Sequence, residues 1–365
     1  MQHRSKFSAL SVLLCSALGL TSCLSSADDD GSASGDKAVV AHIAEAVGIP
    51  VHAALSTEVT ALRQALDSVC AAPSAAGASQ AREAWRTAQR AWFHADAFGI
   101  GPVTMNRLGS SIAWPPDHEA IAETLAEVES STEAIDQGFV ANLGSSRKGL
   151  GAIEMLLFEP ADDAELVTAL VGRRCDLLVA LVADVDRAAV ALSEAWRGDY
   201  GPAMAAANGD PFPRQQAVID ALVNRHVEIT ESLLVTQIGT PLGEKTGGVP
   251  QPDKVLSTRS EFARAEIAAT IEGIAAIYAG VGEGPGLIDS IQRRQSGLAA
   301  DLTAGLTEAI SAVNAIEQPL HIAVAESPEQ VRTALEAVRV VKRLLAADVA
   351  NVLGVTRTFS ENDGD

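Results

Sequence analysis

Apolar residues recur at helical spacing along most of this chain, from residue 37 to residue 356. No run of strand length alternates convincingly between apolar and polar residues. Segments that each expose one apolar helical stripe bury it by packing helix on helix. The pattern therefore predicts an all-α fold, and the residues that interrupt it mark where helices end.

These interruptions divide the chain into helices and two halves. In the first half, helices are expected at 37–70 (broken or kinked at 48–50, Gly-Ile-Pro), 78–98, 117–136, 147–158 and 162–196. In the second half, they are expected at 214–238, 256–280, 286–316 and 327–354. The sequence NGDPFPR at 208–214 is a cluster of helix breakers, so we place the boundary between domains there. The expected architecture is two packed four-helix bundles, residues 37–208 and 209–365.

The N-terminus has the pattern of a secretion signal. Arg4 and Lys6 precede an apolar stretch at 7–20, which is shorter than the roughly 20 residues of a membrane span. The stretch ends in Leu-Thr-Ser-Cys, a bacterial lipobox with Cys23 as the lipid-modified residue. Residues 1–22 are then a lipoprotein signal peptide; the alternative is conventional cleavage, with Cys23 incidental.

Residues 23–36 lead from this cysteine to the first helix. They are small, polar and acidic, which predicts a flexible tether. Leu24, where some lipoproteins have aspartate, favours transfer to the outer membrane. We therefore expect a lipid-anchored protein of the cell envelope, facing the periplasm, with the membrane as one partner.

The formal net charge is −20. Such an acidic chain is a poor candidate for binding nucleic acid or anionic lipid surfaces. It is compatible with cationic ligands, although solubility alone also explains the charge.

Two cysteines remain besides Cys15 of the signal and Cys23. In an oxidising compartment, Cys70 and Cys175 are expected to form a disulfide, with two unpaired thiols as the alternative. Closing a loop of this length stabilises a fold by about 4–5 kcal/mol in the chain-entropy model.

One carboxylate stands within an apolar helical stripe. Leu150, Ile153, Glu154 and Leu157 fall at i, i+3, i+4 and i+7, so they share one helix face. A buried carboxylate needs a cation, hydrogen-bond donors or a metal, because burying it unpaired costs several kcal/mol. The simplest interpretation is a core helix with one structurally paired glutamate.

Other features surround this helix. Gly149 and Gly151 lack side chains, which allows a ligand or another backbone to approach. The segment 99–116, which contains Arg107 and Trp114, is long for a helix connection, and such loops are often functional.

The run RKGLGAIEMLLF at 147–158 resembles the signature of the imelysin-like family, Gly-x-His-x-x-Glu followed by an apolar run. Glycine stands at position 151 in place of the histidine, as in the Gly-Leu-x-Ala-x-Glu branch. Weaker matches extend over most of the chain, at 70–73 (Cys-Ala-Ala-Pro), 101–102 (Gly-Pro), 114–115 (Trp-Pro) and 238–243 (IGTPLG). The family comprises bacterial lipoproteins and periplasmic proteins, among them an insulin-cleaving outer-membrane protease and iron-regulated protein A.

The resemblance implies two helical bundles with the signature helix near an interdomain groove. It also implies a link to iron uptake, so iron, another divalent metal or an iron-carrying partner is the leading ligand class. The expected function is non-catalytic binding; the alternatives are a metal-dependent peptidase with Glu154 as base, and a purely structural envelope protein. The candidate groove residues are Arg107, Trp114, Asp117, Gly149, Gly151 and Glu154.

Arg107 is the expected partner of Glu154, because a guanidinium offers two parallel donors to a carboxylate. If so, Arg107→Ala should cost about 3–5 kcal/mol. The alternative is a solvated arginine on a mobile loop.

Other possible metal ligands are sparse. The zinc-protease pattern His-Glu-x-x-His is absent from the sequence. His42 and Glu45 share a helix face but lack an obvious third ligand, and His226 with Glu228 and Glu231 is expected to be a charged helix face. The acidic ending at 360–365 is expected to be a solvated tail.

Overall fold

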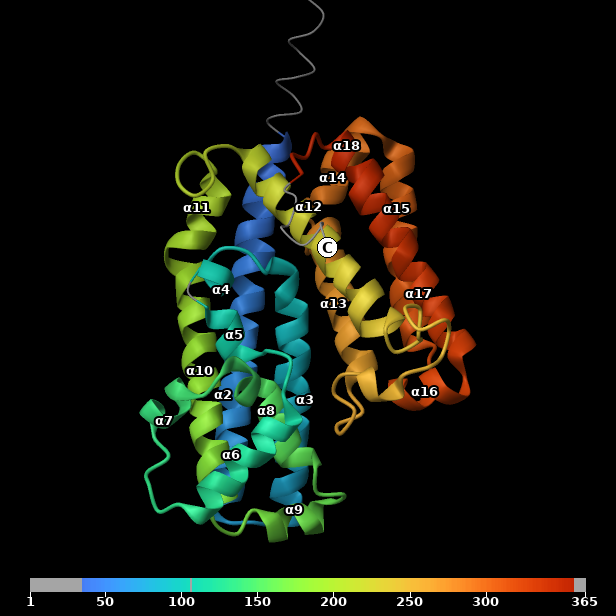
Figure 1. Ribbon diagram of the computed structural model, residues 1–365. Helices are drawn as coiled ribbons and strands as arrows, with labels where there is room; N and C mark the ends of the chain where they lie inside the picture. The colour runs from blue at the N-terminus through green and yellow to red at the C-terminus, as the bar shows by residue number, and fades with distance from the viewer. Residues whose placement is uncertain (1–34, 106, 358–365) are drawn as a thin grey trace, which may run out of the picture.

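A computed structural model describes residues 35–105 and 107–357. Within these ranges every regular element is a helix and no strand occurs, which confirms the all-α prediction. Figure 1 shows the helices in two groups that lie side by side, one from each half of the chain. The predicted signal peptide, Cys23 and the tail at 360–365 lie outside the described residues.

The first group is built on three long helices. The central one is the helix Gly35–Ala71, which ends as α2 (Ile49–Ala71). It packs against α3 (Ala75–Ala95) and α10 (Arg173–Ala195). Ser74 caps α3 by accepting a hydrogen bond from the N–H of Gly77, so this helix begins before the predicted residue 78.

Gly35–Ala71 is also the one helix of the described chain that is long and apolar enough to cross a membrane by length and composition. Half of its most apolar stretch is buried, as in a core helix. The predicted break at 48–50 is wrong, because a π-helical turn, η1 (Ile43–Gly48), carries the helix through Pro50. The carbonyl of Gly48 contacts Nδ1 of His52 at 2.7 Å. Proline has no backbone N–H and cannot make the usual helical hydrogen bond. A wider turn before the proline lets the helix continue without that bond.

The predicted helix 162–196 is two helices. Gly172, with φ of 104°, separates α9 (Asp163–Ala169) from α10. A π turn and a short helix continue α10, and a disulfide joins Cys175 at its start to Cys70 at the end of α2. The predicted pair is therefore present. The continuing elements are η4 (Trp196–Tyr200) and α11 (Gly201–Ala206).

The segment predicted to be irregular contains short helices. They connect the end of α3 to α8 (Gly149–Phe158). The presence of α8 confirms the helix predicted at 147–158. The elements between α3 and α8 are η2 (Asp96–Phe98), α4 (Pro102–Met105), α5 (Leu108–Ile112), α6 (His118–Ser130), α7 (Gln137–Asn142) and η3 (Ser145–Arg147). All ten residues of α8 are buried, because α3, α5, α6 and α10 surround it.

The second group follows the predicted order with three main differences, one of which is the unpredicted helix α16 (Leu320–Glu326). The helix expected at 256–280 begins only at Ala263, and the one expected at 286–316 is divided at Gln295. The elements are α12 (Gln215–Ser232), η5 (Leu233–Gly239), η6 (Pro252–Lys254), α13 (Ala263–Ala279), α14 (Leu287–Arg294), α15 (Ser296–Asn314), α16 (Leu320–Glu326), α17 (Pro328–Arg343), η7 (Leu344–Val349) and α18 (Ala350–Val352).

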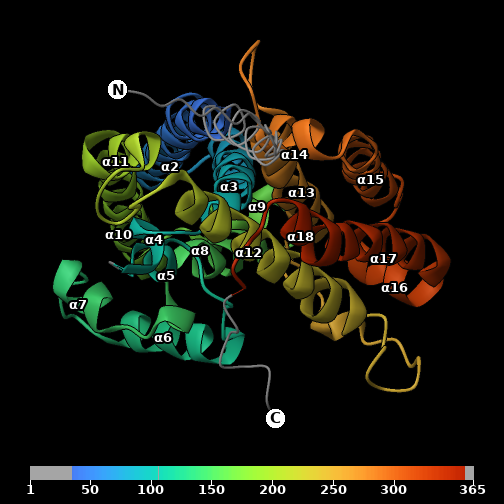
Figure 2. The same cartoon turned by 90° about the horizontal axis from the view of Figure 1, so that it is seen from above.

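The two groups meet along α3 and α13, which lie next to each other in the centre of Figure 2. Gly273 makes this close approach possible, because a Cβ atom there would lie 2.3 Å from the carbonyl oxygen of His94. At the end of the interface, Asp36 is buried between Arg293 (2.8 Å) and Arg294 (2.6 Å). The helix therefore begins inside the predicted tether, and its first turn is held by the second group.

Candidate functional site

The α8 helix presents Glu154 to the second group of helices. Its carboxylate is buried, with 2% of the residue exposed. The oxygen Oε1 accepts two hydrogen bonds from Ser260, one from the backbone N–H at 3.1 Å and one from the hydroxyl at 2.7 Å. Ser260 belongs to the turn that precedes α13, so the carboxylate of the first group is held by the second.

A second carboxylate, Glu266 on α13, is buried beside it. Its Oε1 accepts hydrogen bonds from the hydroxyl of Ser257 and, at 2.7 Å, from the side-chain amide of Gln89 on α3. Ser257 and Ser260 lie in the same turn, and the hydroxyl of Ser260 also donates to the carbonyl of Ser257 at 3.2 Å. One turn of the second group thus supplies donors to both carboxylates.

Burial is the main influence on both acids. It raises the pKa of Glu154, while the two hydrogen bonds from Ser260 and the charge of Arg259 act in the opposite direction. Burial and, to a smaller extent, the neighbouring charge of Glu154 raise the pKa of Glu266 to about 7, while the hydrogen bonds from Ser257 and Gln89 act in the opposite direction. Glu266 therefore gives up its proton closer to neutral pH than an ordinary glutamate does.

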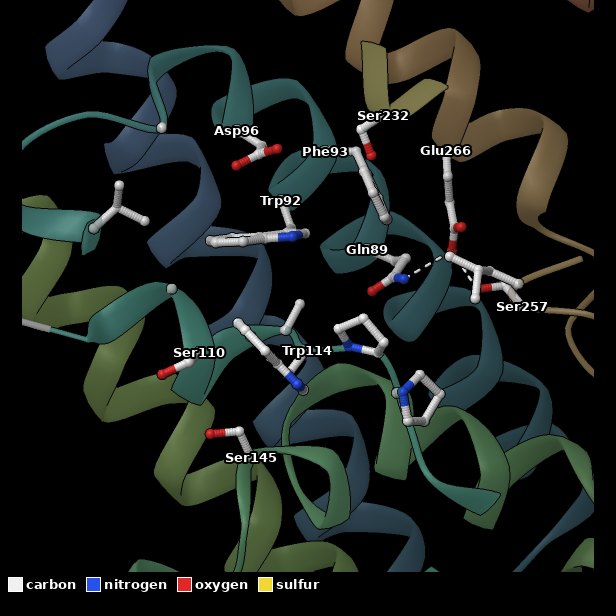
Figure 3. A pocket seen from close by; sticks show the side chains of 18 of the residues that line it. Gln89, Trp92, Phe93, Asp96, Ser110, Trp114, Ser145, Ser232, Ser257 and Glu266 are labelled. Atoms are coloured by element: carbon white, nitrogen blue, oxygen red, sulfur yellow. Dashed lines mark hydrogen bonds between the residues drawn. The ribbon is translucent and has the colours of Figure 1, made fainter. Parts of the chain in front are cut away.

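The two carboxylates lie at one end of a cavity of about 790 Å³ between the two groups of helices. Figure 3 shows the lining around Trp92, Phe93 and Trp114, with Glu266 and Ser257 on the side of the second group. This volume is in the range of small-molecule sites, which are mostly apolar with a few placed polar groups. The arrangement can bind a ligand that has an apolar body and a polar head.

Two residues that line this cavity each have a buried polar atom without a hydrogen-bond partner among the described residues. One is Oε1 of Gln89, a residue that is 5% exposed. The other is Nε of Arg225, whose terminal nitrogens pair with Asp96 at 2.8 Å and Glu228 at 3.1 Å. Buried polar atoms usually have partners, so unpaired ones in a cavity indicate where a bound molecule or water completes the network.

Four of the six predicted groove residues line the cavity: Arg107, Trp114, Gly151 and Glu154. Gly151 allows Pro116 to pack on α8, because a Cβ atom there would lie 3.1 Å from the proline ring. Asp117 does not line the cavity; its side chain accepts a hydrogen bond from the N–H of Ala120 and caps α6.

Gly149 does not line the cavity either. It has φ of 79°, and a Cβ atom there would lie 2.8 Å from the carbonyl oxygen of Ile112. The glycine is therefore needed for the backbone at the start of α8 and for its contact with α5, not for access by a ligand.

The predicted pair of Arg107 and Glu154 is wrong. Arg107 is exposed at the start of α5, and the donors to Glu154 come from Ser260. The carboxylate is satisfied by a hydroxyl and a backbone amide from a residue 106 positions away. Neither donor could be chosen from the sequence, because only the packing of the two halves brings them to α8.

Sequence reasoning missed Glu266, Gln89 and the two serines. Glu266 did carry a signal: Ala263, Glu266, Ile267, Thr270 and Ile274 share one helix face, the same pattern that identified Glu154. Gln89 carried the same signal, because Trp85, Ala88, Gln89 and Trp92 fall at i, i+3, i+4 and i+7. The serines carry no such signal, because serine is common in turns.

The histidines considered as metal ligands have other contacts. Nε2 of His42 lies 3.1 Å from the carbonyl of Val281. The predicted charged face is wrong for His226, which is fully buried with Nε2 3.2 Å from the carbonyl of Ala97, while burial lowers its pKa to about 3. Within residues 35–105 and 107–357, no three His, Cys, Asp or Glu side chains are grouped to hold a metal ion.

A catalytic zinc site needs three protein ligands, usually with histidine among them. The cavity lining, over the described part of the chain, includes neither histidine nor cysteine, and position 151 is glycine. The residues present therefore do not fit a metallopeptidase centre.

The comparisons with known proteins agree with this fold. The sequence model of the family described as Imelysin, Peptidase_M75, matches residues 48–347. Iron-regulated protein A of Synechococcus elongatus is 26% identical over 256 residues, which are 68% of this chain and 65% of that protein. The match thus spans slightly less than two thirds of this relative.

Two crystal structures have the same fold. One is of an iron-regulated protein A precursor from Parabacteroides distasonis, with TM-score 0.75, 21% identity, and coverage of 88% of this chain and 95% of that one. The other is of an imelysin-like protein from Psychrobacter arcticum, with TM-score 0.68, 17% identity, and coverage of 90% and 98%. The family match covers most of the sequence and the fold agrees with it: the chain belongs to the imelysin family.

Proposed function

We propose that this protein is a non-catalytic binding protein of the cell envelope, associated with iron uptake, whose ligand occupies the cavity between the two groups of helices. One observation carries the proposal. Two buried carboxylates, Glu154 and Glu266, line a cavity large enough for a small molecule, and Gln89, whose buried side-chain oxygen is unpaired, lines the same cavity.

The chemistry of the cavity favours binding over hydrolysis. The hydroxyls of Ser257 and Ser260 donate to Glu266 and Glu154, and the cavity lining, over the described residues, includes no histidine or lysine to activate a serine as a nucleophile. Glu154 accepts two hydrogen bonds on one oxygen, which holds it in place for recognition. A metallopeptidase base also needs a metal-bound water next to it, and the described lining supplies no ligand set for the metal.

A cavity-filling variant tests the binding function. Ser232 is exposed at the end of α12 and lines the cavity, so Ser232→Trp should fill it without disturbing the core. Ser311→Trp places the same side chain on the exposed face of α15 and is the matched control. A set of small aromatic amines, alcohols and carboxylic acids is screened by ligand-observed NMR.

We expect compounds from this set to bind the unmodified protein and Ser311→Trp but not Ser232→Trp. Binding that survives in Ser232→Trp, or the absence of any binding compound, would contradict the proposed function. Melting temperatures of the two variants show that both are folded.

The link to iron rests on the relatives, two of which are named for iron regulation. We propose that this protein is also made in response to iron limitation. Its amount, measured by quantitative immunoblotting, should rise when cells are starved of iron. An unchanged amount would contradict the iron link and leave the cavity proposal intact.

The proposed anchor is a lipid on Cys23, which follows Leu-Thr-Ser at the end of the apolar N-terminal stretch. Several acyl chains on one cysteine hold a protein at a membrane durably, because each buried methylene contributes about 0.8 kcal/mol. In the proposed location the protein is at the outer membrane and faces the periplasm. Cys23→Ala should move it from the membrane fraction to the soluble fraction, and retention in the membrane would contradict the anchor.

A further inference from the structure

We infer that the ligand is an organic cation, with its protonated nitrogen between Glu154 and Glu266 and its apolar body against Trp92, Phe93 and Trp114. The inference rests on the proposed function of the cavity and names the chemical class that it selects. Charge, unpaired hydrogen-bonding groups and the character of the walls support it independently.

Charge balance is the first argument. Among the ion pairs of the described residues, none includes Glu154 or Glu266, so these two buried acids have no cation within pairing distance. The other acid in the lining, Asp96, is neutralised by Arg225 at 2.8 Å. At the Glu154 end the only cationic influence is the longer-range charge of Arg259, so a cation placed between the two desolvated carboxylates would reduce their repulsion.

The unpaired oxygen of Gln89 is the second argument. The amide nitrogen of Gln89 donates to Glu266, which leaves its oxygen as an acceptor, and in Figure 3 this oxygen points away from Glu266. Leaving a buried acceptor without a donor is unfavourable. A protonated primary amine carries three N–H donors, which is the number needed for two carboxylates and one amide oxygen.

The walls of the cavity are the third argument. Trp92, Phe93 and Trp114 come from α3 and the segment before α6, and Pro115 and Pro116 extend the apolar surface. Trp114 is 53% exposed and lines the cavity, so its ring is accessible to a ligand. Aromatic faces also attract cations, so these walls favour a positively charged organic molecule over a neutral one.

A bare metal ion fits these observations less well. An ion fills a small part of a cavity of about 790 Å³ and leaves the aromatic walls uncovered. Metal sites in proteins also gather more ligands than two carboxylates, and the described residues offer no group of three. Metal binding is nevertheless a distinct outcome of the test below.

Three probes of similar shape and different charge test the inference: phenethylamine, phenethyl alcohol and 3-phenylpropionate. Their affinities for the full-length mature protein are measured by isothermal titration calorimetry. We expect the amine to bind at least about tenfold more tightly than the alcohol, and 3-phenylpropionate to bind most weakly. Affinity for the amine should rise between pH 5.5 and pH 8, because Glu266 loses its proton in this range while the amine stays charged.

Glu154→Gln and Glu266→Gln keep the size and hydrogen-bonding shape of the side chains and remove the charge. Each should reduce the preference for the amine over the alcohol about tenfold or more, whereas Glu194→Gln, on the exposed face of α10, should leave it unchanged. Circular dichroism and melting temperatures establish that each variant is folded, and the affinity for the alcohol provides a second check on the cavity.

Several results would overturn the inference. If the alcohol or 3-phenylpropionate binds as tightly as the amine or more tightly, the site does not select cations. If that binding is lost in Ser232→Trp, the cavity still binds ligands, and only the cation inference fails. Displacement of the amine by Fe³⁺ or Zn²⁺ alone at stoichiometric concentration would assign the carboxylates to a metal. Amine binding that persists in Ser232→Trp would place it outside the cavity.

Discussion

Ser260 donates both its backbone N–H and its hydroxyl to the same oxygen of Glu154, and this contact joins the two halves of the chain. The serine lies just before α13 and the glutamate lies in the middle of α8. Hydrogen bonds to a charged group are stronger than those between neutral groups. This pair therefore sets the distance between the halves at the acidic end of the cavity.

Ser260→Ala should destabilise the protein by about 1–3 kcal/mol, because a buried carboxylate loses its hydroxyl donor and keeps only the backbone N–H. Chemical denaturation followed by circular dichroism measures the change. Ser311→Ala, at an exposed position of α15, is the control and should stay within about 0.5 kcal/mol of the unmodified protein. Equal stability of the two variants would show that the contact contributes little.

Stability should depend on pH through Glu266. Its pKa is raised from 4.5 to about 7 in the folded protein, so the folded chain binds this proton where the unfolded chain has already released it. The contribution of Glu266 to stability is therefore full below about pH 4.5 and is lost as the pH rises through 7. The raised pKa of Glu154 acts in the same direction.

Glu266→Gln removes this dependence, while the amide oxygen that replaces the carboxylate can still accept hydrogen bonds from Ser257 and Gln89. As the pH rises from 4.5 to 8, the free energy of unfolding of the variant should increase relative to that of the unmodified protein by up to about 3 kcal/mol. Urea denaturation at a series of pH values provides the comparison. A constant difference across the series would contradict the raised pKa.

Two arginines of the cavity lining should differ in their effect on stability. Arg225 is mostly buried between Asp96 and Glu228, so Arg225→Ala should cost about 2 kcal/mol or more by leaving Asp96 without its partner. Arg107 is exposed, so Arg107→Ala should cost less than about 0.5 kcal/mol. Thermal unfolding of both variants under one condition tests this order. A larger loss of stability in Arg107→Ala than in Arg225→Ala would contradict it and would support pairing of Arg107 with Glu154.

Gly149→Ala should destabilise the start of α8 by about 1–3 kcal/mol. Its backbone has φ of 79°, and the new Cβ atom would lie 2.8 Å from the carbonyl oxygen of Ile112. Gly144→Ala is the matched control, because Gly144 has φ of −61° and no atom within 4 Å of an added Cβ. Denaturation curves of the two variants should separate clearly; overlapping curves would show that Gly149 has no special conformational role.

Much of the fold could be predicted from the sequence, because helical periodicity is a local property. The run at 147–158 revealed a buried helix and, within it, a carboxylate that must find donors. The pairing of Cys70 with Cys175 followed from cysteine count and compartment. Boundaries were less accurate where one residue decides them: Gly172 divides a predicted helix, and Pro50 does not, because a π turn compensates for it.

The amino-acid sequence by itself determined that the chain is helical and that Glu154 lies within an apolar helix face. Only the tertiary structure decided which groups meet that carboxylate. The donors come from Ser260, and the second acid is Glu266, more than 100 positions away along the chain. Local spacing specifies which face of a helix is apolar, but it carries no information about which distant helix covers that face, and the cavity exists only where the two halves meet.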